Sequence, residues 1–139
     1  MLLDALLADD LKPKDRREQG GVTRASRAAA IVHAAIHDAV NGVERKISPY
    51  LVQDRAPAGA SIEAAAAGAG HATLGGLYPS QRVTFDAALV QYLGSLPGGP
   101  GRDSGARFGA AVGNALLMAR QHDGRNQPDP PYLEKATPA

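Results

Sequence analysis

The feature that most constrains the fold is an alanine-rich run between residues 24 and 50, RASRAAAIVHAAIHDAVNGVERKISPY. Apolar residues recur along it at the helical period, namely Val32, Ile36, Ala39 and Val43. The run therefore predicts one long helix that begins after Thr23, a suitable N-cap, and ends near Glu44. Pro49 supports this end, because proline disfavours helical geometry in the residue before it.

The segments on either side of this run also predict helices. Residues 2–11 place four leucines on one stripe, Leu2, Leu3, Leu6 and Leu7. The charged residues 12–21 follow, with proline and glycine as breakers, and we expect a solvated connection there. Ser61 is expected to cap a second long helix, with Glu63 in its first turn, which ends near Gly75.

Two more helices are predicted towards the C-terminus. One restarts at Pro79-Ser80 and stops before Pro97, and the other runs from Asp103 or Ser104 to Gln121 with Asp123-Gly124 as its C-terminal cap. The apolar face of the first consists of Phe85, Leu89, Tyr92 and Leu96. The apolar face of the second consists of Phe108, Val112, Ala115 and Ala119.

Glycines recur every four residues in the last of these helices, at Gly105, Gly109 and Gly113. Two interpretations are open. The glycines either form a groove in which a neighbouring helix lies close, or they are weak positions tolerated in an alanine-rich helix at a cost of about 1 kcal/mol each.

These patterns together predict an all-α fold with four or five helices in bundle-like packing, since no strand pattern or fixed repeat occurs. Aromatic residues make up only 4% of the chain and tryptophan is absent, so the core must consist of small aliphatic side chains that let helices approach closely. Three regions are expected: a short helix with a charged connection (1–21), a helical domain (22–124) and a proline-rich, extended or disordered tail (125–139).

Charge and composition exclude several classes of partner and site. A formal charge of +1 gives no field that would favour nucleic acid or an anionic membrane surface. The absence of cysteine excludes disulfides, thiolate metal sites and cysteine nucleophiles. No apolar run is long enough to cross a membrane and the first residues lack signal-peptide features, so the default expectation is a cytoplasmic protein.

An ordered set of landmarks resembles the N-terminal helical half of the vanadium-dependent haloperoxidases and the related soluble phosphatidic-acid-phosphatase-type phosphatases. The landmarks, which span about residues 22–125, are the helix from Arg24 through Asn41, Pro49-Tyr50, the helix EAAAAGAGHATL after Ser61, the corner Leu77-Tyr78-Pro79-Ser80, and the helix end Arg120…Asp123-Gly124. The resemblance implies vanadate-dependent halide oxidation or phosphomonoester hydrolysis for a whole protein of this family.

The motifs that build the family's anion site are missing from this chain. They are a Lys followed by Arg-Pro, a Pro-Ser-Gly-His, and a Ser-Arg…His…Asp. No Arg-Pro occurs, and Pro79-Ser80 continues with Gln81-Arg82. We therefore assign no catalytic or cofactor-binding residue here, and expect vanadate only if a C-terminal half is present.

One near match to the third motif requires a separate interpretation. Ser26-Arg27 is followed by His33 at the right spacing, but the aspartate position falls on His37, and Asp38 comes one residue, or about 100° of helix rotation, later. We interpret this match as coincidence, with an independent phosphatase built on Ser26, Arg27 and His33 as the alternative.

The spacing of His33 and His37 also allows a metal hypothesis. Residues four apart share a helix face, and zinc sites use this spacing. Asp38, His71 or His122 would have to complete the ligand set. The alternative, which we prefer, is that these side chains belong to a polar network between helices.

Two functions follow from these observations. The first is a helical scaffold half of a haloperoxidase-like or phosphatase-like protein, inactive alone and partnered by a C-terminal catalytic half. The second is a freestanding helical interaction module that associates through its small-residue faces. A helical half built for a larger partner is expected to leave apolar faces uncovered, formed by Phe85, Leu89, Tyr92 and Leu96 or by Phe108 and Val112, and so to produce a homo-oligomer.

Overall fold

Five α-helices and two 3₁₀ turns form the part of the protein that the computed structural model describes, residues 1–125 and 127. In chain order these are α1 (Leu2–Asp10), η1 (Lys14–Arg16), α2 (Val22–Glu44), α3 (Ile62–Leu77), η2 (Pro79–Gln81), α4 (Arg82–Ser95) and α5 (Pro100–Ala119). Those residues contain no strand, and the prediction of an all-α fold with four or five packed helices is confirmed. Apart from residues 125 and 127, the predicted proline-rich tail, 125–139, lies outside the described residues.

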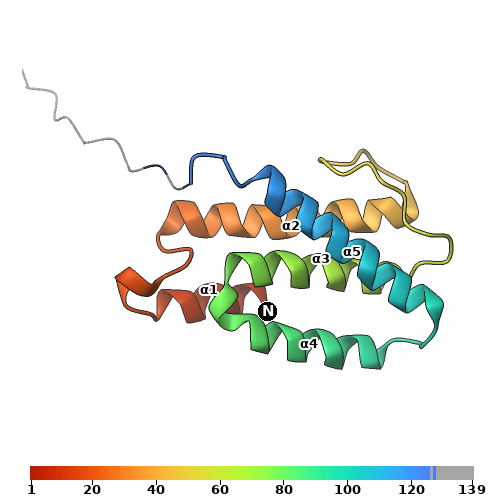
Figure 1. Ribbon diagram of the computed structural model, residues 1–139, viewed down its shortest axis with the longest axis horizontal. Helices are drawn as coiled ribbons and strands as arrows, with labels where there is room; N and C mark the ends of the chain where they lie inside the picture. The colour runs from red at the N-terminus through yellow and green to blue at the C-terminus, as the bar shows by residue number, and fades with distance from the viewer. Residues whose placement is uncertain (126, 128–139) are drawn as a thin grey trace, which may run out of the picture.

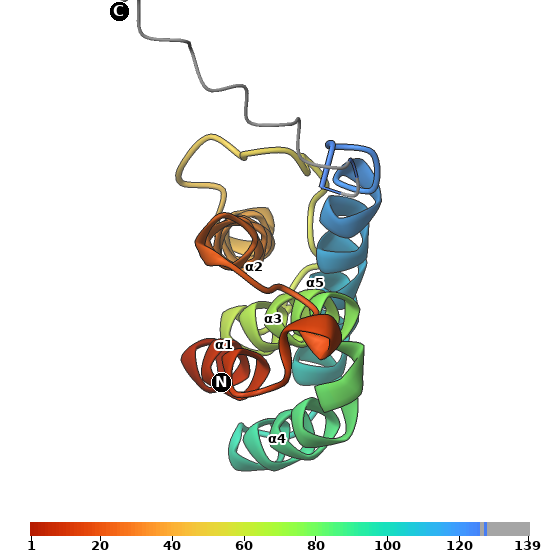
Figure 2. The ribbon, with the colours of Figure 1, turned by 90° about the vertical axis from the view of Figure 1, so that its left-hand side faces the viewer.

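Helix α3 is the centre of the bundle. It packs against α2, α4 and α5, and Figure 2 shows it between α2 and α4 with α5 alongside. In Figure 1, α5 crosses α2 and α3 at an angle. None of the helices in the described part has both the length and the apolarity needed to cross a membrane.

Small residues form the seam between α3 and α5. A Cβ atom on Gly109 would overlap the carbonyl oxygen of Ala65, and one on Gly68 would overlap that of Ala106. A Cβ on Gly113 would lie 2.9 Å from the carbonyl oxygen of Ala69. The groove interpretation of the glycine spacing is therefore confirmed, because each backbone occupies the space that a side chain would need.

The core is correspondingly poor in large side chains. Nine of the seventeen buried apolar residues are alanines. The predicted stripe of α2 faces this core, with Val32 and Ala39 buried and Ile36 and Val43 packed against it. Close helix approach thus compensates for the scarcity of aromatic residues.

The apolar faces that were expected to remain uncovered are largely buried against other parts of the same chain. Phe85 and Val112 are each only 2% exposed, because α4 and α5 turn them into the core. Leu89, Leu96 and Phe108 are partly buried. The expectation was therefore wrong for Phe85 and Val112, and Tyr92 is the one member of the six that the structure leaves exposed.

Helix starts follow the sequence signals in one case and depart from them in two. The Ser61 hydroxyl accepts the N–H of Ala64 at 3.1 Å, so its predicted cap is confirmed. Thr23 is not an N-cap, since α2 begins at Val22 after Gly21, whose φ of +86° favours glycine. Helix α5 begins at Pro100 rather than at Asp103 or Ser104, because proline fits the first helical position.

The helix ends also differ by a few residues from the predicted ones. Helix α3 extends to Leu77, past Gly75, and Pro79 begins the 3₁₀ turn η2 before α4 starts. Helix α5 ends at Ala119 with Arg120 as C-cap, so Asp123-Gly124 lies beyond its end instead of capping it.

Candidate functional site

The Asp38 carboxylate holds the segment that follows α2 against the helix through hydrogen bonds. Its side chain is 1% exposed, and Oδ1 accepts the N–H of Tyr50 at 2.6 Å. Oδ2 accepts the N–H groups of Leu51 and Val52, both at 2.8 Å. Both carboxylate oxygens are thus engaged by backbone amides, which satisfies a buried charge without a metal or a basic side chain.

The two histidines of the metal hypothesis lie on the outer side of α2. Nε2 of His37 lies 3.1 Å from the carbonyl oxygen of Ser48, while His33 is exposed. His71 pairs instead with Asp86, at 2.6 Å. Within residues 1–125 and 127, no group of three or more potential ligands is arranged to hold a metal ion.

The residues of the near-match motif do not converge. The Ser26 hydroxyl donates to the carbonyl oxygen of Val22 in its own helix, at 2.8 Å. Arg27 donates to Asp123 at 2.7 Å and to the carbonyl oxygen of Arg120 at 2.9 Å. Since His33 makes no hydrogen bond among the described residues, nothing in the geometry links these three side chains in one reaction.

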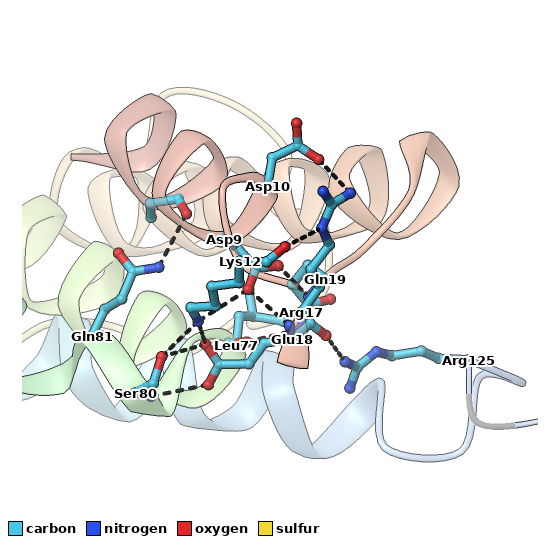
Figure 3. Close-up of polar contacts among 11 residues, drawn as sticks. Asp9, Asp10, Lys12, Arg17, Glu18, Gln19, Leu77, Ser80, Gln81 and Arg125 are labelled. Atoms are coloured by element: carbon cyan, nitrogen blue, oxygen red, sulfur yellow. Dashed lines mark hydrogen bonds and ion pairs between the residues drawn. The ribbon is translucent and has the colours of Figure 1, made fainter. Parts of the chain in front are cut away.

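A network of charged side chains joins the connection after α1 to the α3–α4 corner (Figure 3). Asp9, which is 2% exposed, accepts the N–H groups of Glu18 and Gln19 at 2.8 and 2.7 Å, and Lys12 at 3.1 Å. Glu18 accepts Lys12 at 2.7 Å and the N–H of Ser80 at 3.0 Å. The expectation of a solvated connection over residues 12–21 was therefore wrong at Gln19, which is buried with its side-chain amide donating to Leu77.

The charges of this network stabilise one another. Burial raises the pKa of Asp9 and of Glu18, but the amide donors, Lys12 and Ser80 together outweigh it, so both pKa values lie below their ordinary values. The Glu18 carboxylate raises the pKa of Lys12. Burial, with help from Asp9 and Glu18, raises the pKa of the Tyr78 hydroxyl to about 12.

Ser80 and Lys12 lie as close together as a serine nucleophile and its lysine base, but the direction of their hydrogen bond excludes that role. The Lys12 ammonium donates to the Ser80 hydroxyl at 2.8 Å, and that hydroxyl donates to Glu18 at 2.7 Å. A lysine activates a serine only as the neutral amine, and the raised pKa of Lys12 keeps it protonated. The contact therefore holds η2 to the N-terminal segment and provides no catalytic base.

Arginines gather where the start of α2 meets the end of α5. Arg27 bonds to Asp123, and Arg120 donates to the Tyr50 hydroxyl with its guanidinium 5.7 Å from the centre of the Tyr50 ring. Beneath them is a small hollow of about 200 Å³ with Ile31, Ala34 and Leu116 in its lining.

A larger open cavity adjoins this cluster. Its volume is about 630 Å³, and its lining includes residues 20–24, Arg27, residues 123–125 and Gln127. Sequence reasoning missed it because residues 24 and 125 lie about a hundred positions apart. The available signal was the density of arginine at the start of α2 and beyond the end of α5.

Comparison of the chain with protein-family models, with curated protein sequences and with solved structures gave no match.

Proposed function

We propose that this chain is the helical scaffold half of a vanadium-haloperoxidase-like or phosphatidic-acid-phosphatase-like protein, and that a C-terminal half supplies the anion-binding residues. The observation that carries the proposal is the uncovered apolar surface of the chain. Among the described residues, twelve large apolar side chains are exposed and eight are buried. Exposed apolar side chains in this number, where several share one face, are suited to packing against another chain or domain.

An uncovered apolar stripe lies on α1 and extends to Leu11, directly after the helix. Leu3, Leu7 and Leu11 are 79%, 61% and 78% exposed, and their spacing of four residues places them on one helix face. Beside this face is a mainly apolar hollow of about 390 Å³, to which Val22 and Ala25 contribute. A partner surface of matching apolar side chains would bury the stripe and fill the hollow.

The site geometry supports a scaffold role over catalysis by this chain alone. The buried acids, Asp9 and Asp38, bind backbone amides, and the serine nearest a lysine faces a protonated amine. The ordered landmarks support the proposed family, and the lack of its three motifs in the sequence supports a separate half as the source of the vanadate or phosphate chemistry.

Co-expression tests the proposal. The chain is produced alone and together with any polypeptide from the same locus that carries the Arg-Pro and Pro-Ser-Gly-His motifs. We expect a 1:1 assembly that binds less apolar dye than the free chain and that oxidises halide with vanadate and peroxide, or hydrolyses an aryl phosphate.

The free chain is expected to show neither activity. Turnover by the free chain that His33→Ala abolishes would contradict the proposal and favour a site at Ser26, Arg27 and His33. Absence of any such polypeptide would favour the second candidate, a helical module that associates with its own copies through the leucine stripe of α1.

A further inference from the structure

We infer that the open cavity between the start of α2 and the end of α5 binds a phosphate group through Arg24, Arg27 and Arg125. This inference is independent of the proposed scaffold role, and it concerns residues outside the three motifs of the resembled family. Three observations support it: the cavity itself, the positive charge of the residues that line it, and the N–H donors there that have no acceptor among the described residues.

The lining concentrates positive charge. Three arginines and one aspartate give it a formal charge of +2, whereas the whole chain carries +1, so the remainder carries −1. Asp123 is already neutralised, since it pairs with Arg27 at 2.7 Å. An anion entering the cavity therefore meets an excess of guanidinium groups, which match phosphate oxygens in geometry and charge.

Arg24 occupies a position that is unfavourable unless an anion is present. It lies in the first turn of α2, where the helix dipole disfavours a cation, and that turn contains no acid. Its side chain is exposed and makes no hydrogen bond or ion pair with any described residue. Nothing in the packing of residues 1–125 and 127 accounts for an arginine there.

Backbone N–H groups at the start of α2 provide further hydrogen-bond donors beside the arginines. The N–H groups of Val22, Thr23 and Arg24 precede the first bond of the helix, which runs from the N–H of Ala25 to the carbonyl oxygen of Gly21 at 3.0 Å. No side chain caps them. Uncapped amides at a helix start bind phosphate oxygens when cations lie beside them.

Arg125 lies on the other side of the cavity and has bonding capacity left over. One of its terminal nitrogens donates to the carbonyl oxygen of Glu18, but its Nε is buried with no acceptor among the described residues. Burial lowers the pKa of Arg125 and charge repulsion from Arg27 and Arg24 lowers it further, although Asp123 and Asp9 act in the opposite direction. A phosphate group would relieve this repulsion.

The size of the cavity favours a phosphate carried by a small organic molecule. At about 630 Å³ it lies within the range of sites for such ligands, and it leaves room beyond the phosphate group. Inorganic phosphate would use the same arginines without filling the remaining space.

Calorimetric titration with glucose 6-phosphate, inorganic phosphate and glucose tests the inference. Arg24→Gln and Arg125→Gln are each expected to weaken phosphate binding about tenfold or more, which corresponds to the loss of one charge-assisted contact. Arg55→Gln is the matched control, because Arg55 is exposed, lies in the loop after α2 and bears the same charge. It is expected to leave binding unchanged.

Thermal unfolding separates binding from folding. Arg24→Gln is expected to leave the Tm of the free protein unchanged or higher, and to abolish the rise in Tm that glucose 6-phosphate causes in the wild type. Tighter binding of glucose 6-phosphate than of inorganic phosphate assigns the site to organic phosphates, and equal affinity assigns it to free phosphate. No binding by the wild type, or equal losses in Arg24→Gln and Arg55→Gln, would overturn the inference.

Discussion

Gly109 of α5 lies against Ala65 of α3 so closely that a β-carbon on Gly109 would overlap the Ala65 carbonyl oxygen. The same β-carbon would lie 2.9 Å from the backbone nitrogen of Ala69. Because both neighbours are backbone atoms of a helix, neither can move aside without moving α3 itself. This contact therefore fixes the distance between the two helices that form the largest interface of the bundle.

We predict that Gly109→Ala destabilises the protein. Alanine improves helix propensity by up to about 1 kcal/mol, but the forced separation of α3 and α5 is expected to cost more, for a net loss of about 1–3 kcal/mol. Urea unfolding measures the difference. The control is Gly94→Ala in α4, where a β-carbon meets nothing within 4 Å and stability should stay constant or rise. Equal effects of the two substitutions would show that the seam does not limit the approach of the helices.

Asp38→Ala is expected to loosen the segment after α2. It removes the acceptor of three part-buried backbone N–H groups, and since an unpaired buried donor costs about 1–3 kcal/mol, the loss is expected towards the lower end of that range. Hydrogen exchange should show lost protection at Tyr50, Leu51 and Val52. Asp54→Ala, at an exposed acid of the same loop, should change neither quantity.

Metal analysis of the purified protein complements this test. Because both oxygens of Asp38 bind amides, we expect the metal content to be the same before and after the substitution. Stoichiometric zinc that disappears with His37→Ala would instead restore the metal hypothesis.

The network of Asp9, Lys12 and Glu18 predicts a pH dependence of stability. The pKa values of Asp9 and Glu18 are lowered on folding, so their contribution is present above the unfolded values of 3.8 and 4.5 and is lost as the pH falls through the folded values. The raised pKa of Lys12 acts oppositely, and its contribution is lost as the pH rises beyond 10.5 through the folded value.

Glu18→Gln should therefore flatten the acid limb of the stability profile. Denaturant titrations between about pH 3 and pH 6 measure the limb, because that range brackets the ordinary carboxyl values. Asp15→Asn is the control, since Asp15 is exposed and forms no ion pair among the described residues. An acid limb that is identical in Glu18→Gln and the wild type would show that the pairing of Glu18 with Lys12 contributes no stability.

We predict that the free chain associates through α1. Light scattering should report a mass that rises with concentration above the 14.3 kDa of one chain. Replacing Leu3, Leu7 and Leu11 together by Gln should restore the monomer and reduce the binding of apolar dyes. Replacing Val83 and Val90, equally exposed but on α4, should leave the association intact. A wild-type monomer at high concentration with no dye binding would contradict the prediction.

Apolar periodicity was sufficient to predict the helices, because it is a local property of the chain, whereas the end signals misplaced the starts of α2 and α5 and the end of α5. The spacing of Gly105, Gly109 and Gly113 also predicted a close neighbour, although it could not identify α3 as that neighbour. The covering of Phe85 and Val112 was not predictable, since an apolar stripe shows that a face is buried without showing whether the same chain buries it.

The polar sites were harder to predict, and the reason is sequence distance. Asp38 was expected in a network between helices, but its partners are backbone amides of a loop that has no side-chain signature. The arginine cavity requires residues 24 and 125 to meet, which only the packing of α2 against α5 determines.

The network around Asp9 has a consequence for the order in which the protein folds during synthesis. Its inner bonds, from Glu18 and Gln19 to Asp9, join residues that leave the ribosome together. Its outer bonds wait for Leu77, Ser80 and Arg125, which follow 58, 62 and 107 residues after their partners. The N-terminal segment is therefore synthesised first and bound last, and until then Leu2 and Leu6, the leucines of α1 that pack against the core, remain accessible to a chaperone on the nascent chain.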